Sequence, residues 1–338
     1  MNSKQALKRF REFGGMRLLW RYVRMGLLWP AVKALAIGLL REHSVKAAYA
    51  RLIRTVEQRL VGQYEPIMLE AKAQEEGIDA RCGVPTILWT CWLQGLDQAP
   101  LLVRQCVASQ RKCFPGYEHH VLTLDNYEEW VNLPETIKRK FKQGRIPAAL
   151  LSDLLRLAVL QKYGGVWMDA TVVCTGLVND KLQKQWRQMM ESKMTVFRYF
   201  VPKTQTATGV SNWFIATVAG NAVMRTVYEM LLAYWRDYDC TVDYYMMHLF
   251  LELSQRHFPE MWSDMPCLNS RHALLLGKAL AAPYREEDWE ELTGHVCIHK
   301  LNYRKVDAAM KHIGCYCEKL LAMDFQTANG KACSIRHS

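Results

Sequence analysis

The chain has 338 residues, of which 50% are hydrophobic and 23% are charged, with a formal net charge of +11 at pH 7. This composition excludes a disordered chain, and the length is sufficient for one large core or two small ones. The eleven cysteines are scattered without a C-x-x-C pair, which excludes an ordinary zinc knuckle and indicates reduced cytosolic thiols rather than a disulfide framework.

The net charge is concentrated in residues 1–40, which carry eight basic side chains against Glu12 alone, a balance of +7. Leu, Trp and Met lie between the charges, a pattern typical of a segment that binds an anionic membrane surface. The alternatives are a basic helix packed on the protein and a nucleic-acid arm, but no base-reading motif follows, so no nucleic-acid partner is predicted. The apolar run Met25–Leu40 is interrupted by Pro30 and Lys33 and is shorter than the roughly 20 residues of a membrane span, and no clear secretory cleavage site follows.

Three helices are predicted in the N-terminal region, over residues 1–30, 44–60 and 65–76. Pro30 should break or kink the first of them, and Gly62 should separate the other two. We therefore predict a basic helical region over residues 1–82, associated with a membrane surface, and a second domain that begins near Gly83.

The second domain opens with a β-rich run, Pro85–Trp92, which is predicted as a strand closed by Gly95. A helix over 100–112 and a strand over 118–124 follow. Strands that alternate with helices predict a mainly parallel sheet, in which ligands bind at the carboxyl ends of the strands. Trp92 falls at such an end and is either an aromatic platform for a ligand or a core tryptophan.

The stretch from 148 to 163 is apolar on nearly every side, which predicts a buried helix rather than an amphipathic one. Asp153 and Arg156 interrupt it and share one face because they are three residues apart. A buried carboxylate and guanidinium are costly unless they pair or contact a ligand, so an ion pair and a ligand site are both open interpretations. A Gly-Gly pair should end the helix, and residues 166–168 should form a short buried strand.

Asp169 stands at the end of that strand, and alternation places Thr171 on the same side of the extended run. Asp243 either complements a helix N-terminus or faces a ligand, and His248 is predicted as a core histidine. The later elements are strands over 195–199 and 212–219, a polar loop over 203–209 between them, helices over 221–235 and 241–258, a loop and helix over 266–281, a short apolar run over 296–303 and a terminal helix over 306–323.

Residues 152–171 resemble the S-D-x-x-R … Y-G-G-x-Y-x-D-x-D signature of sugar-nucleotide glycosyltransferases. That group includes the initiating mannosyltransferases of glycosyltransferase family 32, the clostridial glucosylating toxins and the bacterial capsular polysaccharide synthesis proteins. Residues 85–95, 243–248 and 296–303 also resemble runs of the same proteins. The matching positions of the signature are Ser152, Asp153, Arg156, Tyr163, Gly164, Gly165 and Asp169, with Thr171 in place of the second Asp.

The resemblance implies a GT-A type fold, an α/β domain over residues 83–305 with an open, Rossmann-like mixed sheet flanked by helices. The N-terminal helical extension would precede it, and a C-terminal helix and tail would occupy residues 306–338. The implied activity is a metal-dependent, retaining hexosyl transfer from a nucleotide-sugar donor, with a UDP-sugar favoured, to a glycan or lipid-linked oligosaccharide. The implied setting is capsule, exopolysaccharide or lipopolysaccharide biosynthesis in a bacterium, by a peripheral protein on the inner face of the cytoplasmic membrane.

A Mn²⁺ or Mg²⁺ ion is part of this implied activity, because a divalent cation offsets the charge of a diphosphate leaving group and hard oxygen ligands suit both cations. The resemblance assigns Asp169 and His299 to the metal, although His299 is otherwise a surface or core histidine. Thr171 would bind the metal directly or through water. The alternative function is a non-catalytic, membrane-associated scaffold of a polysaccharide assembly complex with a degenerate donor site, which Thr171 favours.

The donor nucleotide and sugar would occupy the remaining candidate residues. Trp92 and Gly95 would lie at the base, and Arg156 and Lys300 would offset the charge of the donor. The candidate catalytic residues are Asp153, which would hold sugar hydroxyls and orient Arg156, Arg156 itself, and Asp243, which would face the donor sugar or the acceptor hydroxyl.

Overall fold

The computed structural model describes residues 20, 22–40, 45–73, 83–198, 209–241, 244–266, 268–323 and 325. Its centre is a five-stranded sheet with the strand order β2-β1-β3-β6-β5. The strands are β1 (Ile87–Cys91), β2 (Glu118–Leu122), β3 (Gly165–Met168), β5 (Met194–Arg198) and β6 (Val210–Thr217). β1 pairs in parallel with β2 and β3, whereas β6 is antiparallel to β3 and β5. The described sheet is therefore mixed, as the resemblance implied, and not mainly parallel as the alternation of elements predicted.

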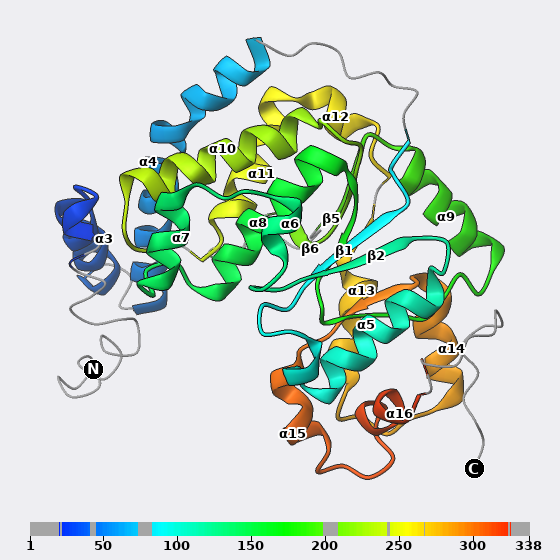
Figure 1. Cartoon of the computed structure of the whole chain (residues 1–338). Coiled ribbons are helices and arrows are strands. Elements are labelled where there is room, and N and C mark those ends of the chain that lie inside the picture. The colour runs from blue at the N-terminus through cyan, green and yellow to red at the C-terminus, as the bar shows by residue number, and fades with distance from the viewer. Residues whose placement is uncertain are drawn as a thin grey trace.

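Helices cover both faces of this sheet (Figure 1). Successive strand residues point to opposite faces, so the neighbours Trp89 and Leu88 of β1 belong to different cores. The core that contains Trp89 also contains side chains of α8 (Ala148–Tyr163), α10 (Ala222–Asp237) and α11 (Met246–His257). The core that contains Leu88 also contains side chains of α9 (Asp180–Glu191) and of a second, two-stranded sheet of β4 (Val172–Cys174) and β7 (Ile298–Lys300).

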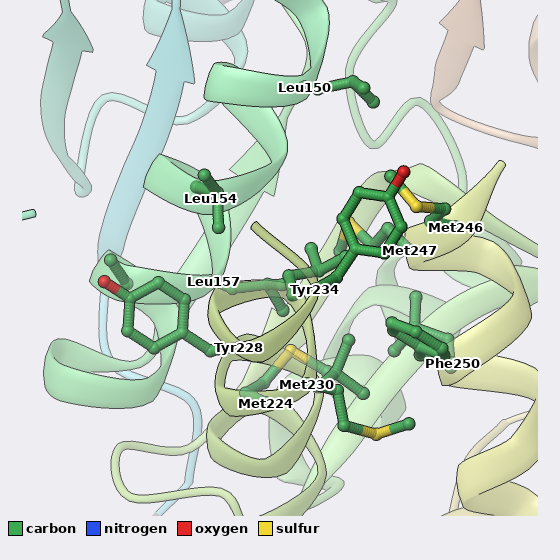
Figure 2. Close-up of a cluster of buried hydrophobic side chains, with 14 of the residues drawn as sticks. Leu150, Leu154, Leu157, Met224, Tyr228, Met230, Tyr234, Met246, Met247 and Phe250 are labelled. Atoms are coloured by element: carbon green, nitrogen blue, oxygen red, sulfur yellow. The ribbon is translucent and has the colours of Figure 1, made fainter. Parts of the chain in front are cut away.

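The buried helix predicted at 148–163 is confirmed as α8, with Pro147 as its N-cap residue and Gly164 as its C-cap residue. Figure 2 shows Leu150, Leu154 and Leu157 of α8 beside Tyr228 and other side chains of α10 and α11. Burying each leucine contributes roughly 1.5–3 kcal/mol, which anchors the helix at the centre of the protein. Asn221 accepts a hydrogen bond from the Met224 amide and so caps the N-terminus of α10.

The turn between α8 and β3 requires its two glycines. Gly164 and Gly165 have φ angles of 66° and 96°. A Cβ atom on Gly165 would lie 2.6 Å from the carbonyl oxygen of Ile87, and one on Gly164 would lie 2.5 Å from the amide nitrogen of Ala219. The two glycines therefore allow β3 to follow α8 through a tight turn and to pair with β1.

The N-terminal region differs from the prediction at Gly62. One continuous helix, α4 (Val45–Ala73), replaces the two helices predicted over 44–60 and 65–76. Leu60, Tyr64 and Met68 are buried at a spacing of four residues, and α4 packs through this stripe on α10 and α11. Gly62 and Pro66 lie on the exposed side, where water can bind the carbonyl group that the missing Pro66 N–H leaves free. Burial of the stripe outweighs the two local helix breakers.

The predicted helix break also moves, from Pro30 to the turn around Gly26, whose φ is 66°. Helix α3 (Leu28–Leu40) begins two residues before Pro30 and packs on α4. Proline is tolerated there because the first turn of a helix does not need its N–H groups. Residues 1–19 lie outside the described part of the chain, and no described helix is long and apolar enough to cross a membrane.

The C-terminal region also differs, because a turn at Gly314 with φ 70° separates α15 (Val306–Ala309) from α16 (Tyr316–Ala322) where one helix was predicted. Residues 201–208 and 242–243 are outside the described part, and α11 begins at Met246 rather than at 241. The remaining elements are α5 (Leu101–Cys113), α6 (Tyr127–Trp130), α7 (Glu135–Lys142), α12 (Pro259–Ser263), α13 (Ser270–Ala279), α14 (Glu286–His295), and the 3-10 turns η1 (Leu96–Gln98) and η2 (Tyr303–Lys305).

Candidate active site

The carboxyl ends of β1 and β3 open into a pocket of about 480 Å³. The first two turns of α8 line it on one side, and β6, α11 and η2 each contribute side chains to its wall. Its charged lining residues are Asp153, Arg156, Asp169 and Arg304. The topology therefore brings together residues that are more than 150 positions apart, at the edge of the sheet where the strand order predicted a ligand site.

Arg156 joins the two carboxylates of the pocket. Its Nη1 donates to Oδ1 of Asp153 at 2.8 Å, and its Nη2 donates to Oδ1 of Asp169 at 3.0 Å. The guanidinium lies 4.7 Å from the centre of the Trp167 ring, and the residue is only 4% exposed. Nε has no hydrogen-bond partner among the described residues. The predicted Asp153–Arg156 ion pair is thus present, and it extends to the end of β3.

Asp169 accepts hydrogen bonds on both carboxylate oxygens. Oδ1 also accepts from Trp167 Nε1 at 3.0 Å, and Oδ2 accepts from Lys300 Nζ at 2.5 Å. Burial would raise the pKa of Asp169, but Lys300 and Arg156 outweigh burial and hold this pKa below its usual range. Lys300 Nζ also donates to Thr171 Oγ1 at 2.7 Å, so one ammonium group bridges the two side chains of the D-x-T run.

Asp153 is in a different electrostatic position from Asp169. Burial raises its pKa to about 6, and Asp169 adds to this while Arg156 opposes it. Asn212 Nδ2 donates to Asp153 Oδ1 at 3.1 Å, a contact that the sequence analysis did not foresee. The one available signal was an amide directly before the apolar run Trp213–Ala216 of β6. Burial lowers the pKa of His248 to about 3, which keeps this pocket residue neutral.

Most of the predicted donor residues reach the pocket. Asp153, Arg156, Asp169, Thr171 and Trp92 line it, and Lys300 contacts Asp169 and Thr171. The Trp92 ring packs edge-to-face on Tyr303 with ring centroids 5.6 Å apart, so it is both a wall of the pocket and a packed side chain. Tyr244 and Tyr303 are lining residues that the sequence analysis did not single out as site residues.

Four predicted site residues are not placed in the lining of the pocket, and one of them, Lys300, contacts two residues that are. Gly95 forms the turn after Trp92, with φ 81° and an N–H that donates to the Trp92 carbonyl at 2.9 Å. His299 is fully buried on the opposite face of β7 from Lys300, where its Nε2 lies 3.3 Å from Thr175 Oγ1. The structure therefore does not bring His299 to Asp169. Asp243 lies outside the described residues.

The described donor set does not fit a divalent cation. No three His, Cys, Asp or Glu side chains of the described part are grouped closely enough to hold a metal ion. Asp169 is tied to Arg156 and Lys300, and the charges of Asp153, Arg156, Asp169 and Lys300 sum to zero. Mg²⁺ and Mn²⁺ take about six oxygen-rich ligands, whereas this set offers two carboxylates that already pair with Arg156 and one hydroxyl that accepts from Lys300.

Comparison with known proteins identifies a family and a similarity to solved structures. A sequence model described as "Capsular polysaccharide synthesis protein" matches residues 38–320. A solved structure titled "PaToxG Glycosyltransferase" has a TM-score of 0.38 and 12% identity, and the match covers 73% of this chain and 99% of that chain. No curated protein matches the chain.

Proposed function

The chain belongs to the capsular polysaccharide synthesis protein family, and from this membership we propose that it is a glycosyltransferase that moves a sugar from a nucleotide-sugar donor to a glycan acceptor. The observation that carries the proposal is the pocket at the ends of β1 and β3, where Arg156 and Lys300 converge on Asp169. A nucleoside diphosphate gains negative charge as the bond to the sugar breaks. Fixed cations in a partly buried pocket stabilise that charge more strongly than water does.

Each charged residue has a separate task in this proposal. Arg156 and Lys300 face the diphosphate, and Asp169 holds both of them in position. Asp153 accepts hydrogen bonds from sugar hydroxyls and orients Arg156, while Asn212 fixes the Asp153 carboxylate. Trp92 offers an aromatic wall to the base.

The finer features of the activity follow the family resemblance. A GT-A type arrangement is supported by the order β1, α5, β2, α8, β3 and by the ligand pocket at the strand ends. Retention of configuration is supported by the state of the described pocket carboxylates, because Asp153 and Asp169 are both tied to Arg156 and neither is placed as a free base. The leaving phosphate would then take the proton of the acceptor hydroxyl. The proposed acceptor is a glycan or a lipid-linked oligosaccharide, and the proposed donor is a hexose nucleotide such as a UDP-sugar.

A scaffold without activity is the second candidate, favoured by one observation: the protein's own side chains already satisfy Asp169 and Thr171. Such a protein would keep the pocket and bind no donor productively. The two candidates differ in turnover, which a donor screen measures directly.

The test is release of nucleotide from a panel of UDP-, GDP-, ADP- and CMP-sugars by the purified chain. We expect turnover of at least one donor, and a loss of roughly 100-fold or more in Arg156→Met, because removing one fixed donor of this kind reduces rates by about 10²–10³. Arg225→Met is the matched control, because Arg225 is an exposed arginine of α10 away from the pocket. A folded protein that turns over none of the donors would support the scaffold.

The proposed location is a membrane surface, on the cytoplasmic side. Large apolar side chains of the N-terminal region are exposed rather than packed, including Trp20 at 58% and Trp29 at 75%. They belong to the segment of residues 1–40 whose charge balance is +7. Exposed tryptophan among basic residues is suited to the headgroup region of an anionic bilayer.

A further inference from the structure

We infer that the ammonium group of Lys300 takes the place of a divalent cation, so that the proposed sugar transfer needs no metal ion. This inference rests on the proposed function and departs from the metal dependence that the family resemblance implied. Lys300 Nζ lies 2.5 Å from Asp169 Oδ2 and 2.7 Å from Thr171 Oγ1. Those are the two side chains that the D-x-D pattern assigns to the metal.

The backbone holds Lys300 at this position. Val172 is paired with Lys300 between β4 and β7, and the amide of Leu301 donates to the carbonyl of Thr171 at 2.8 Å. Helix α13 also packs closely on this strand, because a Cβ atom on Gly277 would lie 2.5 Å from the Lys300 carbonyl oxygen. The strand that carries Lys300 is therefore built directly onto the D-x-T segment, and the ammonium group needs no conformational change to reach Asp169.

The charges of the cluster also favour lysine over a metal. The two carboxylates, Asp153 and Asp169, are balanced by the two cations, Arg156 and Lys300. A divalent cation at Asp169 would add two positive charges next to both existing cations, in a partly buried site where repulsion is weakly screened. Asp169 accepts three hydrogen bonds, which leaves it little capacity as a metal ligand.

Thr171 fits the same conclusion. An aspartate at this position would give the cluster a net charge of −1 and a second oxygen-rich ligand, as a cation site requires. A threonine hydroxyl is neutral and accepts from Lys300 instead. The change from Asp to Thr and the presence of Lys300 thus act together, because each removes part of the need for a metal.

Lys300 can still contact the donor while it holds Asp169. An ammonium group has three N–H donors, and two of them are used by Asp169 and Thr171. Its side chain is 23% exposed and its two partners line the pocket, so the inference assigns the third N–H to a phosphate oxygen of the donor. In the transfer, the bond between the sugar C1 and the diphosphate oxygen breaks and its electron pair passes to that oxygen. The acceptor oxygen bonds to C1, its proton passes to the leaving phosphate, and Lys300 takes no part in the proton transfer.

The first test measures metal binding without turnover. Mn²⁺ is titrated with the protein, and free Mn²⁺ is followed by electron paramagnetic resonance, with and without UDP. We expect no protein-dependent loss of the free Mn²⁺ signal up to millimolar protein beyond what UDP alone causes. Stoichiometric binding that Asp169→Asn removes would overturn the inference, whether or not any donor is turned over. This readout keeps failure of the inference distinct from failure of the proposed function.

The second test uses the donor found by the screen. Turnover by the native protein should change less than twofold in excess EDTA, and Lys300→Met should lose about 100-fold or more, while Lys300→Arg should keep more activity than Lys300→Met. Lys278→Met is the matched control, because Lys278 is an exposed lysine of α13. Loss of activity in EDTA that added Mn²⁺ restores would overturn the inference. Full activity of a folded Lys300→Met protein would also overturn it.

Discussion

Arg156 is the residue on which the electrostatics of the pocket depend. It is buried, contacts both carboxylates through its two terminal nitrogens, and lies against Trp167. The pKa values of the two carboxyl groups shift in opposite directions, because Asp169 has Lys300 as a second cation and Asp153 does not. The pKa of Asp169 is lowered, whereas burial raises the pKa of Asp153 to about 6.

The raised pKa of Asp153 predicts how activity depends on pH. Above about pH 6 the carboxylate is ionised and pairs with Arg156, and below it the group is protonated and the ion pair is lost. We expect kcat/KM for the donor to fall below about pH 6, and Asp153→Asn to be less active but to lack this acidic limb. The measurement is a pH profile of both proteins from pH 4.5 to 8. If kcat/KM of Asp153→Asn still falls below about pH 6, another group causes the fall.

Protein stability should respond to Asp153 with the opposite sign. A carboxyl group whose folded pKa lies above its unfolded value binds more protons in the folded state. Its contribution to the free energy of unfolding therefore decreases as pH rises from about 4 to about 6. Denaturant unfolding of native protein and Asp153→Asn at several pH values should show this difference. If the free energy of unfolding of the native protein instead rises relative to that of Asp153→Asn between about pH 4 and pH 6, the raised pKa of Asp153 is contradicted.

A double variant separates structural and functional roles of the ion pair. In Asp153→Leu with Arg156→Met, two apolar side chains replace a buried pair, which is often neutral or stabilising, and Asp169 keeps Trp167 and Lys300 as partners. We expect the melting temperature to stay within a few degrees of the native value, and donor turnover to fall by about 100-fold or more. Circular dichroism and the donor assay measure the two effects. A stable double variant with full activity would show that the pair is only structural.

At the scale of elements, packing decides where helices begin and end. α4 continues through Gly62 and Pro66 because Leu60, Tyr64 and Met68 are buried on its inner side. The turn between α8 and β3 depends on backbone geometry instead. Its second glycine, Gly165, has φ 96° and no room for a Cβ atom.

Two glycine substitutions test these element boundaries with opposite expected signs. Gly62→Ala should raise the free energy of unfolding by about 0.5–1 kcal/mol, because alanine is favoured inside a helix and no atom lies within 4 Å of the added Cβ. Gly165→Ala should lower it by about 1–3 kcal/mol from backbone strain, with a further loss from the 2.6 Å contact with Ile87. Urea unfolding measures both. Destabilisation by Gly62→Ala would contradict a continuous α4.

At the scale of the whole molecule, the N-terminal region has one packed side and one exposed side. Tyr22, Met25 and Leu27 are buried, whereas Trp20 and Trp29 are exposed. Deleting this region would therefore uncover core residues as well as remove the proposed membrane contact. Point substitutions of the exposed tryptophans are the cleaner test.

Flotation with anionic vesicles measures the proposed membrane contact. The native chain should float with vesicles that contain phosphatidylserine or phosphatidylglycerol, and Trp20→Ser with Trp29→Ser should float less. Binding should weaken in 1 M salt, where the Debye length is about 3 Å, and an apolar part should remain. Ile313→Ser is the control, because Ile313 is 96% exposed in another part of the chain. Equal flotation of the native and tryptophan variants would place the contact elsewhere.

The sequence by itself determined the elements that carry a strong local signal. An apolar run of 16 residues between Pro147 and Gly164 predicted α8 correctly. The signature from Ser152 to Thr171 identified Asp153, Arg156 and Asp169 as neighbours in one site, since helix periodicity and a two-glycine turn fix their relation over a short distance. Family membership followed from the same residues.

Tertiary structure alone decided the features that depend on contacts between distant segments. The antiparallel pairing of β6 with β3, the continuity of α4 and the burial of His299 all follow from packing partners far away in the chain. The same holds for the meeting of Lys300 with Asp169, which are 131 positions apart. Local propensities differ by about 1 kcal/mol or less for most residues, whereas burial of a large side chain contributes roughly 1.5–3 kcal/mol. Where the two disagree, the buried contacts determine the structure, and here they place an ammonium group where the sequence pattern predicted a metal.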